Sequence, residues 1–246
     1  WECKGFQLGA RLEHPQAFIN RLQYGRPESF RALGAAEYNM SCRPQGNNVP
    51  GATSFCMCPG GEIIPATSDV NQFCSNGMSN AKRDGKFANS AIIATVSPEQ
   101  FCHQPRLAYQ LLSTIESKAF QLADAPYAAP AQNASDFLHG VKSRTLRESS
   151  YKLGLTPARL DSILPENIGN ALKNAVMTFE RLHHGFEEYG TFIGVETRVS
   201  SPVRFLRMPN SQQSSLKNLY FAGEGAGMAG GITSAAVDGI KIAEDI

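Results

Sequence analysis

The chain has 246 residues, of which 42% are hydrophobic and 18% charged, and its formal net charge is +1. A chain of this length and composition can bury a core, either as one large domain or as two small ones. Its basic residues are scattered along the sequence, which argues against nucleic acid or an anionic membrane surface as a partner. Small molecules or proteins are the partners that remain, and nothing in the composition indicates the oligomeric state.

No apolar run approaches the roughly 20 residues of a membrane-spanning helix, and the first residues lack the layout of a signal peptide. We therefore expect a cytoplasmic protein. The cysteines are too sparse for a disulfide scaffold, so we expect reduced thiols. They are Cys3, Cys42, Cys56, Cys58, Cys74 and Cys102.

The first part of the chain predicts a short helix followed by a meander of antiparallel strands. The helix covers residues 14–25 and ends at Gly25. Short runs with partial alternation then follow, separated by Gly, Pro and Asn, as is typical of strands and turns. These runs are residues 35–43, 52–58, 62–68, 70–76 and 90–97.

The hydrophobic period changes after Pro105, where leucine, isoleucine and alanine recur every three or four residues up to Leu122. This spacing predicts an amphipathic helix. Residues 123–135 carry two prolines and predict a loop, and residues 165–189 predict a second long helix that starts at a proline. Beyond Gly190 we expect strands over 191–207, a polar loop, a strand over 218–223 and a final helix. The fold class is therefore α+β.

Two cysteines two residues apart, Cys56 and Cys58, lie in a predicted strand, where both side chains would point to the same face. They could address one ligand, one metal or each other, but a metal would need two further soft ligands, and the sequence offers no matching motif. The default interpretation is a pair of small buried side chains in the core. A redox or substrate-facing role for the thiols remains the alternative.

Other polar clusters are weaker candidates. His183 and Glu187 have the i,i+4 spacing of a chelating pair, with His184 alongside, but without a third ligand we predict no metal site. Ser214 and Lys217 reproduce the S-x-x-K spacing of some acyl-transfer enzymes, although a lysine in a polar loop would stay hydrated and protonated.

Arg83 and Asp84 lie in a predicted loop between strands. A solvated turn is the default interpretation of such a charge cluster. Because loops beside a site often carry binding residues, Arg83 remains a candidate for an anionic group of a substrate.

The last segment contains G-x-G-x-x-G at Gly225, Gly227 and Gly230, between a predicted strand and a predicted helix. A dinucleotide-binding βαβ unit needs roughly 30 residues and an acidic residue about 20 positions later, and only 16 residues of the sequence follow Gly230. A helix start still offers unpaired N–H groups and a partial positive charge, which suit an electron-rich group other than a phosphate.

The segment "FAGEGAGMAGGITSAAVDG" resembles the C-terminal flavin-contacting segment of FAD-dependent oxidoreductases with a glutathione-reductase-like FAD domain. More closely, the whole chain is similar to the C-terminal part of the bacterial uncharacterised FAD-dependent dehydrogenases. This resemblance spans nearly the whole sequence and rests on "FQLGARLEHPQ", "FCMCPGGEIIPATS", "NGMSNAKRDGKFANSA" and "GVETRVSSPVRFLR" together with the last segment.

The resemblance implies a set of FAD-contacting positions. Glu224 matches the acidic residue that binds the ribityl chain or a hydroxyl on the phosphate side, and the helix start matches the backbone beneath the flavin pyrimidine edge. A glycine-rich turn that only packs the last helix is the structural alternative. The implied cofactor-binding residues are Gly223, Glu224, Gly225, Gly230, Gly231, Ile232 and Thr233.

The resemblance also implies a division into a substrate-side domain, residues 1–190, and a C-terminal segment of an FAD domain, residues 191–246. The N-terminal βαβ unit of such proteins has no counterpart here, so we expect a fragment that alone binds FAD weakly or not at all. The whole protein would transfer hydride between a small-molecule substrate and FAD. No catalytic acid or base can be assigned, and a scaffold that kept the fold without the cofactor is the alternative.

Overall fold

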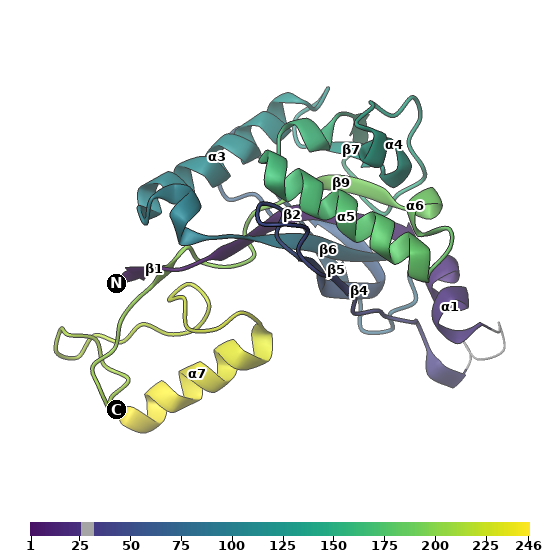
Figure 1. Ribbon diagram of the computed structural model, residues 1–246. Coiled ribbons are helices and arrows are strands. Elements are labelled where there is room, and N and C mark those ends of the chain that lie inside the picture. The colour runs from purple at the N-terminus through teal and green to yellow at the C-terminus, as the bar shows by residue number, and fades with distance from the viewer. Residues whose placement is uncertain (26–31) are drawn as a thin grey trace. The chain divides into compact units, whose positions relative to one another are not determined.

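The computed structural model describes residues 1–25 and 32–246, which form two compact units (Figure 1). Unit 1 comprises residues 1–7, 96–112 and 198–246, and unit 2 comprises residues 8–95 and 113–197. Strand β9, Thr191–Glu196, belongs to the sheet of unit 2. The two units are defined by compactness, whereas the division predicted at residue 190 is between functions. That functional division stays a prediction.

The helices and strands follow one another as an α+β chain, which confirms the predicted fold class. The strands are β1 (Glu2–Cys3), β2 (Phe6–Pro15), β3 (Ser41–Cys42), β4 (Ala52–Pro65), β5 (Ser75–Ser79), β6 (Phe87–Val96), β7 (Ala129–Asn133), β8 (Leu155–Pro157), β9 and β10 (Val203–Arg204). The helices are α1 (Gln16–Tyr24), α3 (Pro105–Gln121), α4 (Ala134–His139), α5 (Glu166–Leu182), α6 (Phe186–Tyr189) and α7 (Ile232–Asp245), with 3-10 turns at Pro98–Phe101 and Leu160–Ser162.

One large sheet forms the centre of unit 2. Its strands lie in the order β3-β4-β6-β2-β9-β7-β8, and β5 pairs with β4. The pairs that β2 and β7 make with β9 are antiparallel, whereas β7 and β8 run parallel. Close strand approach depends on Gly9 in β2, where a Cβ atom would lie 1.9 Å from the carbonyl oxygen of Ile92.

Helix α5 packs against β3 and β4 (Figure 1). Its buried side chains recur every three or four residues, as an amphipathic helix requires; they include Ile168, Leu172, Ala175 and Phe179. The helix predicted over 165–189 is wrong as one element, because Gly185 adopts a left-handed φ of 94° and separates α5 from α6. The Glu180 carboxylate stabilises this break by accepting N–H bonds from Gly185 and Glu187, each at 2.9 Å.

The predictions for α1 and α3 are confirmed, since α1 ends at the C-cap Gly25 and α3 begins at Pro105. The loop predicted over 123–135 is wrong, because it contains β7 and the start of α4. The prediction of separate strands over 52–58 and 62–68 is also wrong. Residues 52–65 form the one strand β4, because Gly60 and Gly61 form an irregularity within the strand instead of ending it, and residues 66–68 lie beyond its end.

Unit 1 contains the antiparallel pair β1–β10 and helix α7. The predicted final helix is confirmed, but residues 218–223 do not form the predicted strand. In the described residues Tyr220 makes only an isolated bridge to Gln213, and a strand is stable only where a neighbouring strand accepts its backbone hydrogen bonds. Among the residues that the structure describes, no helix combines the length and apolar character needed to cross a membrane.

Candidate functional site

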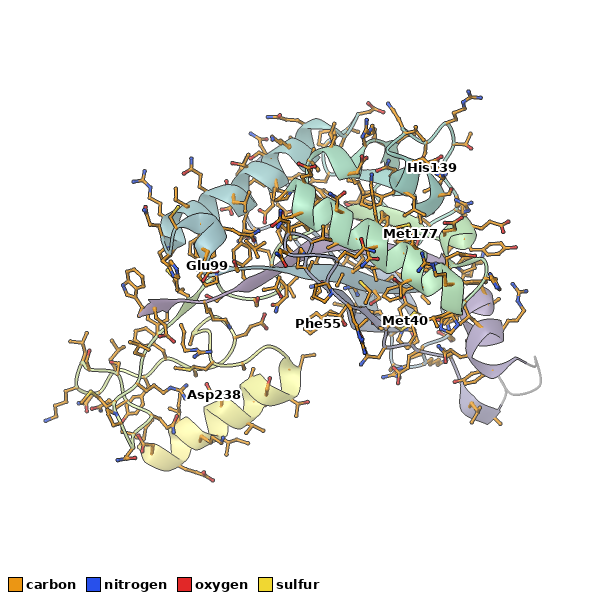
Figure 2. All side chains as sticks on the ribbon, viewed as in Figure 1. Met40, Phe55, Glu99, His139, Met177 and Asp238 are labelled. Carbon is orange, nitrogen blue, oxygen red and sulfur yellow. The ribbon has the colours of Figure 1, made fainter. Side chains whose placement is uncertain are left out.

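A partly buried ion pair fixes the entry to the glycine loop of unit 1. The Arg207 guanidinium donates to both carboxylate oxygens of Asp238, at 2.8 and 2.7 Å, and to the carbonyl oxygen of Phe221. Asp238, labelled on α7 in Figure 2, also accepts the Gly223 N–H at 2.8 Å. The hydrogen bonds from Arg207 hold the pKa of Asp238 below its ordinary value. Position 223 is thereby joined to the second turn of α7.

Gly227 holds the middle of the loop against β10. Its φ is 74°, and a Cβ atom there would lie 2.1 Å from the carbonyl oxygen of Val203, so only glycine fits. The Gly227 carbonyl oxygen accepts hydrogen bonds from Lys4 at 3.3 Å and from Arg204 at 3.4 Å. The loop therefore has a defined path, held by side chains of unit 1.

Glu224 occupies a half-buried place in this loop. Burial raises the pKa of its carboxyl group, and the nearby Lys4 ammonium acts in the opposite direction. Within the described residues no hydrogen bond is recorded for the carboxylate, so its oxygens can accept from a hydroxyl group. This is the role that the sequence assigns to Glu224.

The start of α7 is open. Nothing lies within 4 Å of a Cβ atom built at Gly225 or at Gly230, and no side chain caps the helix at Gly231. Ile232 is 90% exposed, and Thr233 beside it is also exposed. Since the first N–H groups of a helix have no intrahelical partners, this start presents donors to an electron-rich group.

The predicted cofactor-binding residues thus share one loop and one helix start, where acceptor and donors are of the kinds that a flavin's hydroxyls and pyrimidine edge require. The residues present fit the cofactor. Their individual roles stay predictions.

A second polar site lies inside unit 2 and was not predicted from the sequence. Arg11 on β2 is 0% exposed, and its Nη1 donates to both carboxylate oxygens of Glu196, at 3.2 and 3.0 Å. Its Nε donates to Asn89 Oδ1 at 2.8 Å. Burial raises the pKa of Glu196, and the arginine opposes this effect. The available signal was a glutamate at the end of the otherwise uncharged strand β9 and an arginine between the apolar residues Ala10 and Leu12 of β2.

The two cysteines of β4 lie beside Arg11. Cys58 Sγ accepts a hydrogen bond from Arg11 Nη2 at 3.1 Å, and the Cys56 carbonyl oxygen accepts one at 2.7 Å. The prediction that both cysteines are buried in the core is wrong, because Cys56 is exposed and Cys58 half-buried. The strand is irregular here and Cys56 has a φ of 45°, so the alternation of a regular strand does not apply.

The weaker candidates do not assemble into sites. His184 lies 3.7 Å from Glu180 rather than forming a ligand set with Glu187, whose backbone N–H also bonds Glu180. The Ser214 hydroxyl donates to the Leu216 carbonyl, within its own loop.

Arg83 is exposed and lies 3.9 Å from Glu37. Asp84 accepts a hydrogen bond from Asn80 in the same exposed loop. Both residues therefore match a solvated turn. Binding of an anionic substrate group by Arg83 stays a prediction.

The comparisons with known proteins support the family resemblance seen in the sequence. Residues 5–199 match the family described as "FAD-dependent protein, C-terminal domain-like". Over 249 aligned residues the chain is 41% identical to an uncharacterized protein of Clostridium beijerinckii (strain ATCC 51743 / NCIMB 8052), covering 100% of this chain and 46% of that relative. The chain thus spans about half of this relative, and residues 200–246 lie beyond the family match. With most of its length matched, the chain belongs to the FAD-dependent protein, C-terminal domain-like family.

Proposed function

We propose that this chain is the C-terminal part of a flavin-dependent oxidoreductase that transfers hydride between a small-molecule substrate and FAD. The observation that carries the proposal is the uncapped start of α7, held in place by the Arg207–Asp238 pair, with Glu224 in the same loop. Family membership supports the cofactor, and the loop supports its position.

The residues of the chain have separate tasks in this proposal. Glu224 accepts hydrogen bonds from cofactor hydroxyls, and the backbone at Gly231, Ile232 and Thr233 donates toward the electron-rich pyrimidine edge, where the positive end of the helix dipole is favourable. Gly225 and Gly230 leave space for close approach of the cofactor. When bound, FAD supplies the hydride chemistry. The rest of the longer protein would supply most contacts to the ADP half.

The absorption spectrum of the purified full-length protein tests the proposal. An oxidised flavin gives a band near about 450 nm, and we expect that band to bleach on addition of a reducing substrate. A full-length protein that cannot be loaded with flavin would contradict the proposal and favour a scaffold. Residues 1–246 alone are expected to bind FAD weakly, because the pyrophosphate cradle of such proteins lies in a βαβ unit.

Variants of Glu224 test the placement of the cofactor. A hydrogen bond to a charged acceptor contributes about 1.5–3 kcal/mol, and 1.4 kcal/mol is about tenfold in affinity. We therefore expect Glu224→Ala to weaken FAD binding to the full-length protein roughly ten- to a hundredfold, and Glu224→Gln to weaken it less. The control is Glu244→Ala, an exposed change near the end of α7. Equal flavin retention in all three variants would contradict a role for Glu224 in binding.

A further inference from the structure

The inference concerns the cysteine pair of β4, which lies in unit 2 and has no part in the proposed flavin contacts. Cys58 Sγ lies 3.3 Å from the carbonyl oxygen of Cys56, so its side chain folds back toward the preceding cysteine. Cys56 is exposed, and its left-handed φ removes it from the regular strand pattern. The pair therefore combines an accessible thiol with a shielded one.

The surroundings of Cys58 are polar and largely buried. Arg11 Nη2 bonds both the Cys56 carbonyl and the Cys58 sulfur. Asn89, the register partner of Cys58 on β6, is completely buried, and its Nδ2 has no hydrogen-bond partner in the described part of the chain. A Cβ atom at Gly77 would lie 2.0 Å from Arg11 Nη2, so this arrangement depends on glycine there. A buried donor without a protein partner is costly, so the Asn89 amide can still donate to a further polar group beside Cys58.

A hollow of about 390 Å³ opens beside Cys56. Polar and aromatic side chains line it together with the backbone of β4, including Phe55, labelled in Figure 2. The other lining residues are Glu37, Tyr38, Asn39, Ser54 and Met57. A small disulfide-containing molecule can approach the exposed thiol from this side.

We propose that Cys56 and Cys58 form a dithiol–disulfide pair that reduces a small-molecule disulfide, with Cys56 as the attacking thiol and Cys58 as the resolving thiol. This activity goes beyond the proposed hydride transfer and needs no flavin for a single turnover. The exposure of Cys56, the position of the Cys58 sulfur and the donors around it carry the assignment.

The exchange balances without a further reagent. The Cys56 thiolate attacks one sulfur of the substrate R–S–S–R′, which forms a mixed disulfide with R–S and releases R′–S⁻. Cys58 then loses its proton and attacks Cys56 Sγ, which forms the Cys56–Cys58 disulfide and releases R–S⁻. Two protein thiols are oxidised, one substrate disulfide is reduced, and the two thiol protons end on the two products.

Burial determines the order of the two thiols. It raises the pKa of the Cys58 thiol, against the opposing effect of Arg11. Cys58 is therefore less often a thiolate than an exposed cysteine would be, and since the thiolate is the attacking species it is the poorer thiol for the first attack. The exposed Cys56 is the thiol that a substrate meets first.

The test uses the full-length protein, reduced and then treated with oxidised glutathione, quenched by alkylation and analysed by peptide mass spectrometry. In the wild type we expect an internal disulfide in the peptide that carries residues 56–58. In Cys58→Ser we expect glutathione to accumulate on Cys56, because the resolving thiol is missing. In Cys56→Ser we expect glutathionylation at Cys58 to be slower than that at Cys56 by at least about tenfold.

Cys102→Ser is the matched control, because Cys102 is also exposed with a left-handed φ of 53°. This variant should react with oxidised glutathione like the wild type.

A protein disulfide, that of oxidised thioredoxin, serves as the second probe. A faster reaction with this probe than with oxidised glutathione would overturn the small-molecule assignment. Absence of the internal disulfide with both probes would overturn the pair itself. If Cys58→Ser fails to fold, Cys58→Ala tests for accumulation of glutathione on Cys56, and the peptide map of the wild type tests for the internal disulfide. Flavin content measured in the same samples separates this result from the proposed function.

Discussion

The two units differ in where they place charged and apolar side chains. Unit 2 buries charge and pairs it: Arg11 contacts Glu196 and Asn89 deep in the sheet. Unit 1 exposes apolar side chains along α7, where Ile232 is 90% and Ile240 58% exposed. A helix normally packs its apolar residues against a neighbour, and an exposed apolar surface marks an interaction site. The charges inside unit 2 are thus paired within the unit, and we expect another protein surface to cover the apolar side chains of α7.

The largest expected effect comes from removing the buried charge of unit 2. Arg11→Met leaves Glu196 without its partner, and breaking a buried ion pair costs about 3–5 kcal/mol. The control is Lys152→Met, which removes an exposed pair with Glu62 and should cost about 1 kcal/mol or less. Free energies of unfolding from urea titrations measure both. Equal costs would contradict the importance assigned to the buried pair.

A second effect appears as a pH dependence from His14, which is 1% exposed. Burial lowers its pKa from 6.5 to about 4. The unfolded chain therefore binds the proton more readily, and stability is lost as the pH falls from 6.5 to about 4. The total is about 3 kcal/mol, since one pKa unit corresponds to about 1.4 kcal/mol.

His14→Gln can keep a donor for the Phe186 carbonyl oxygen, which His14 Nε2 contacts at 2.8 Å. It should flatten the unfolding free energy between pH 6.5 and 4, as measured by urea titrations at a series of pH values. His139→Gln, at an exposed position, should leave the slope unchanged. If the unfolding free energy of His14→Gln still falls as steeply between pH 6.5 and 4, the pH dependence arises from other groups.

Glycine substitutions should act with opposite sign in the two units. Gly9→Ala places a Cβ atom 1.9 Å from a backbone oxygen of β6, so strands must shift, at a cost of about 1–3 kcal/mol. Gly239→Ala in α7 meets nothing within 4 Å and should stabilise the helix by about 0.5–1 kcal/mol. Thermal unfolding measures both shifts, and a stabilising Gly9→Ala would show that the sheet has more space than described.

The smallest effect on residues 1–246 alone is expected at Ile240. In residues 1–246 alone, Ile240→Gln should change the unfolding free energy by about 0.5 kcal/mol or less, because the side chain is mostly exposed. In the full-length protein we expect a larger loss, of about 1.5–3 kcal/mol for a buried isoleucine side chain. Parallel denaturant titrations compare the two proteins. A loss that is equally small in both would show that α7 stays uncovered.

Local patterns were sufficient where an element depends on its own sequence. The spacing of Leu107, Leu111 and Ile115 predicted α3, and Gly25 marked the end of α1. Patterns failed where a distant partner decides the structure. β7 forms because β8 and β9 accept its pairing, and the prolines of residues 123–135 gave no sign of this.

Dependence on distant partners also explains which site residues could be predicted from the sequence. Arg11 and Glu196 are 185 residues apart, and no local rule pairs them. The alternation rule for Cys56 and Cys58 failed because pairing with β6 makes β4 irregular. By contrast, the candidate flavin contacts lie within one continuous loop and helix start. A local motif could therefore bring them together, although the roles of these residues await the experiments above.

The interleaved composition of the two units has a consequence for synthesis. Every segment of unit 2 has been synthesised once residue 197 is translated, whereas unit 1 also needs residues 198–246, which are translated later. At about 5–20 residues per second, translation of residues 198–246 takes seconds, so the chain contains all of unit 2 seconds before it contains all of unit 1. We therefore expect the interior that holds the cysteine pair to form before unit 1, whose segments 1–7 and 96–112 cannot complete their packing until α7 has been translated.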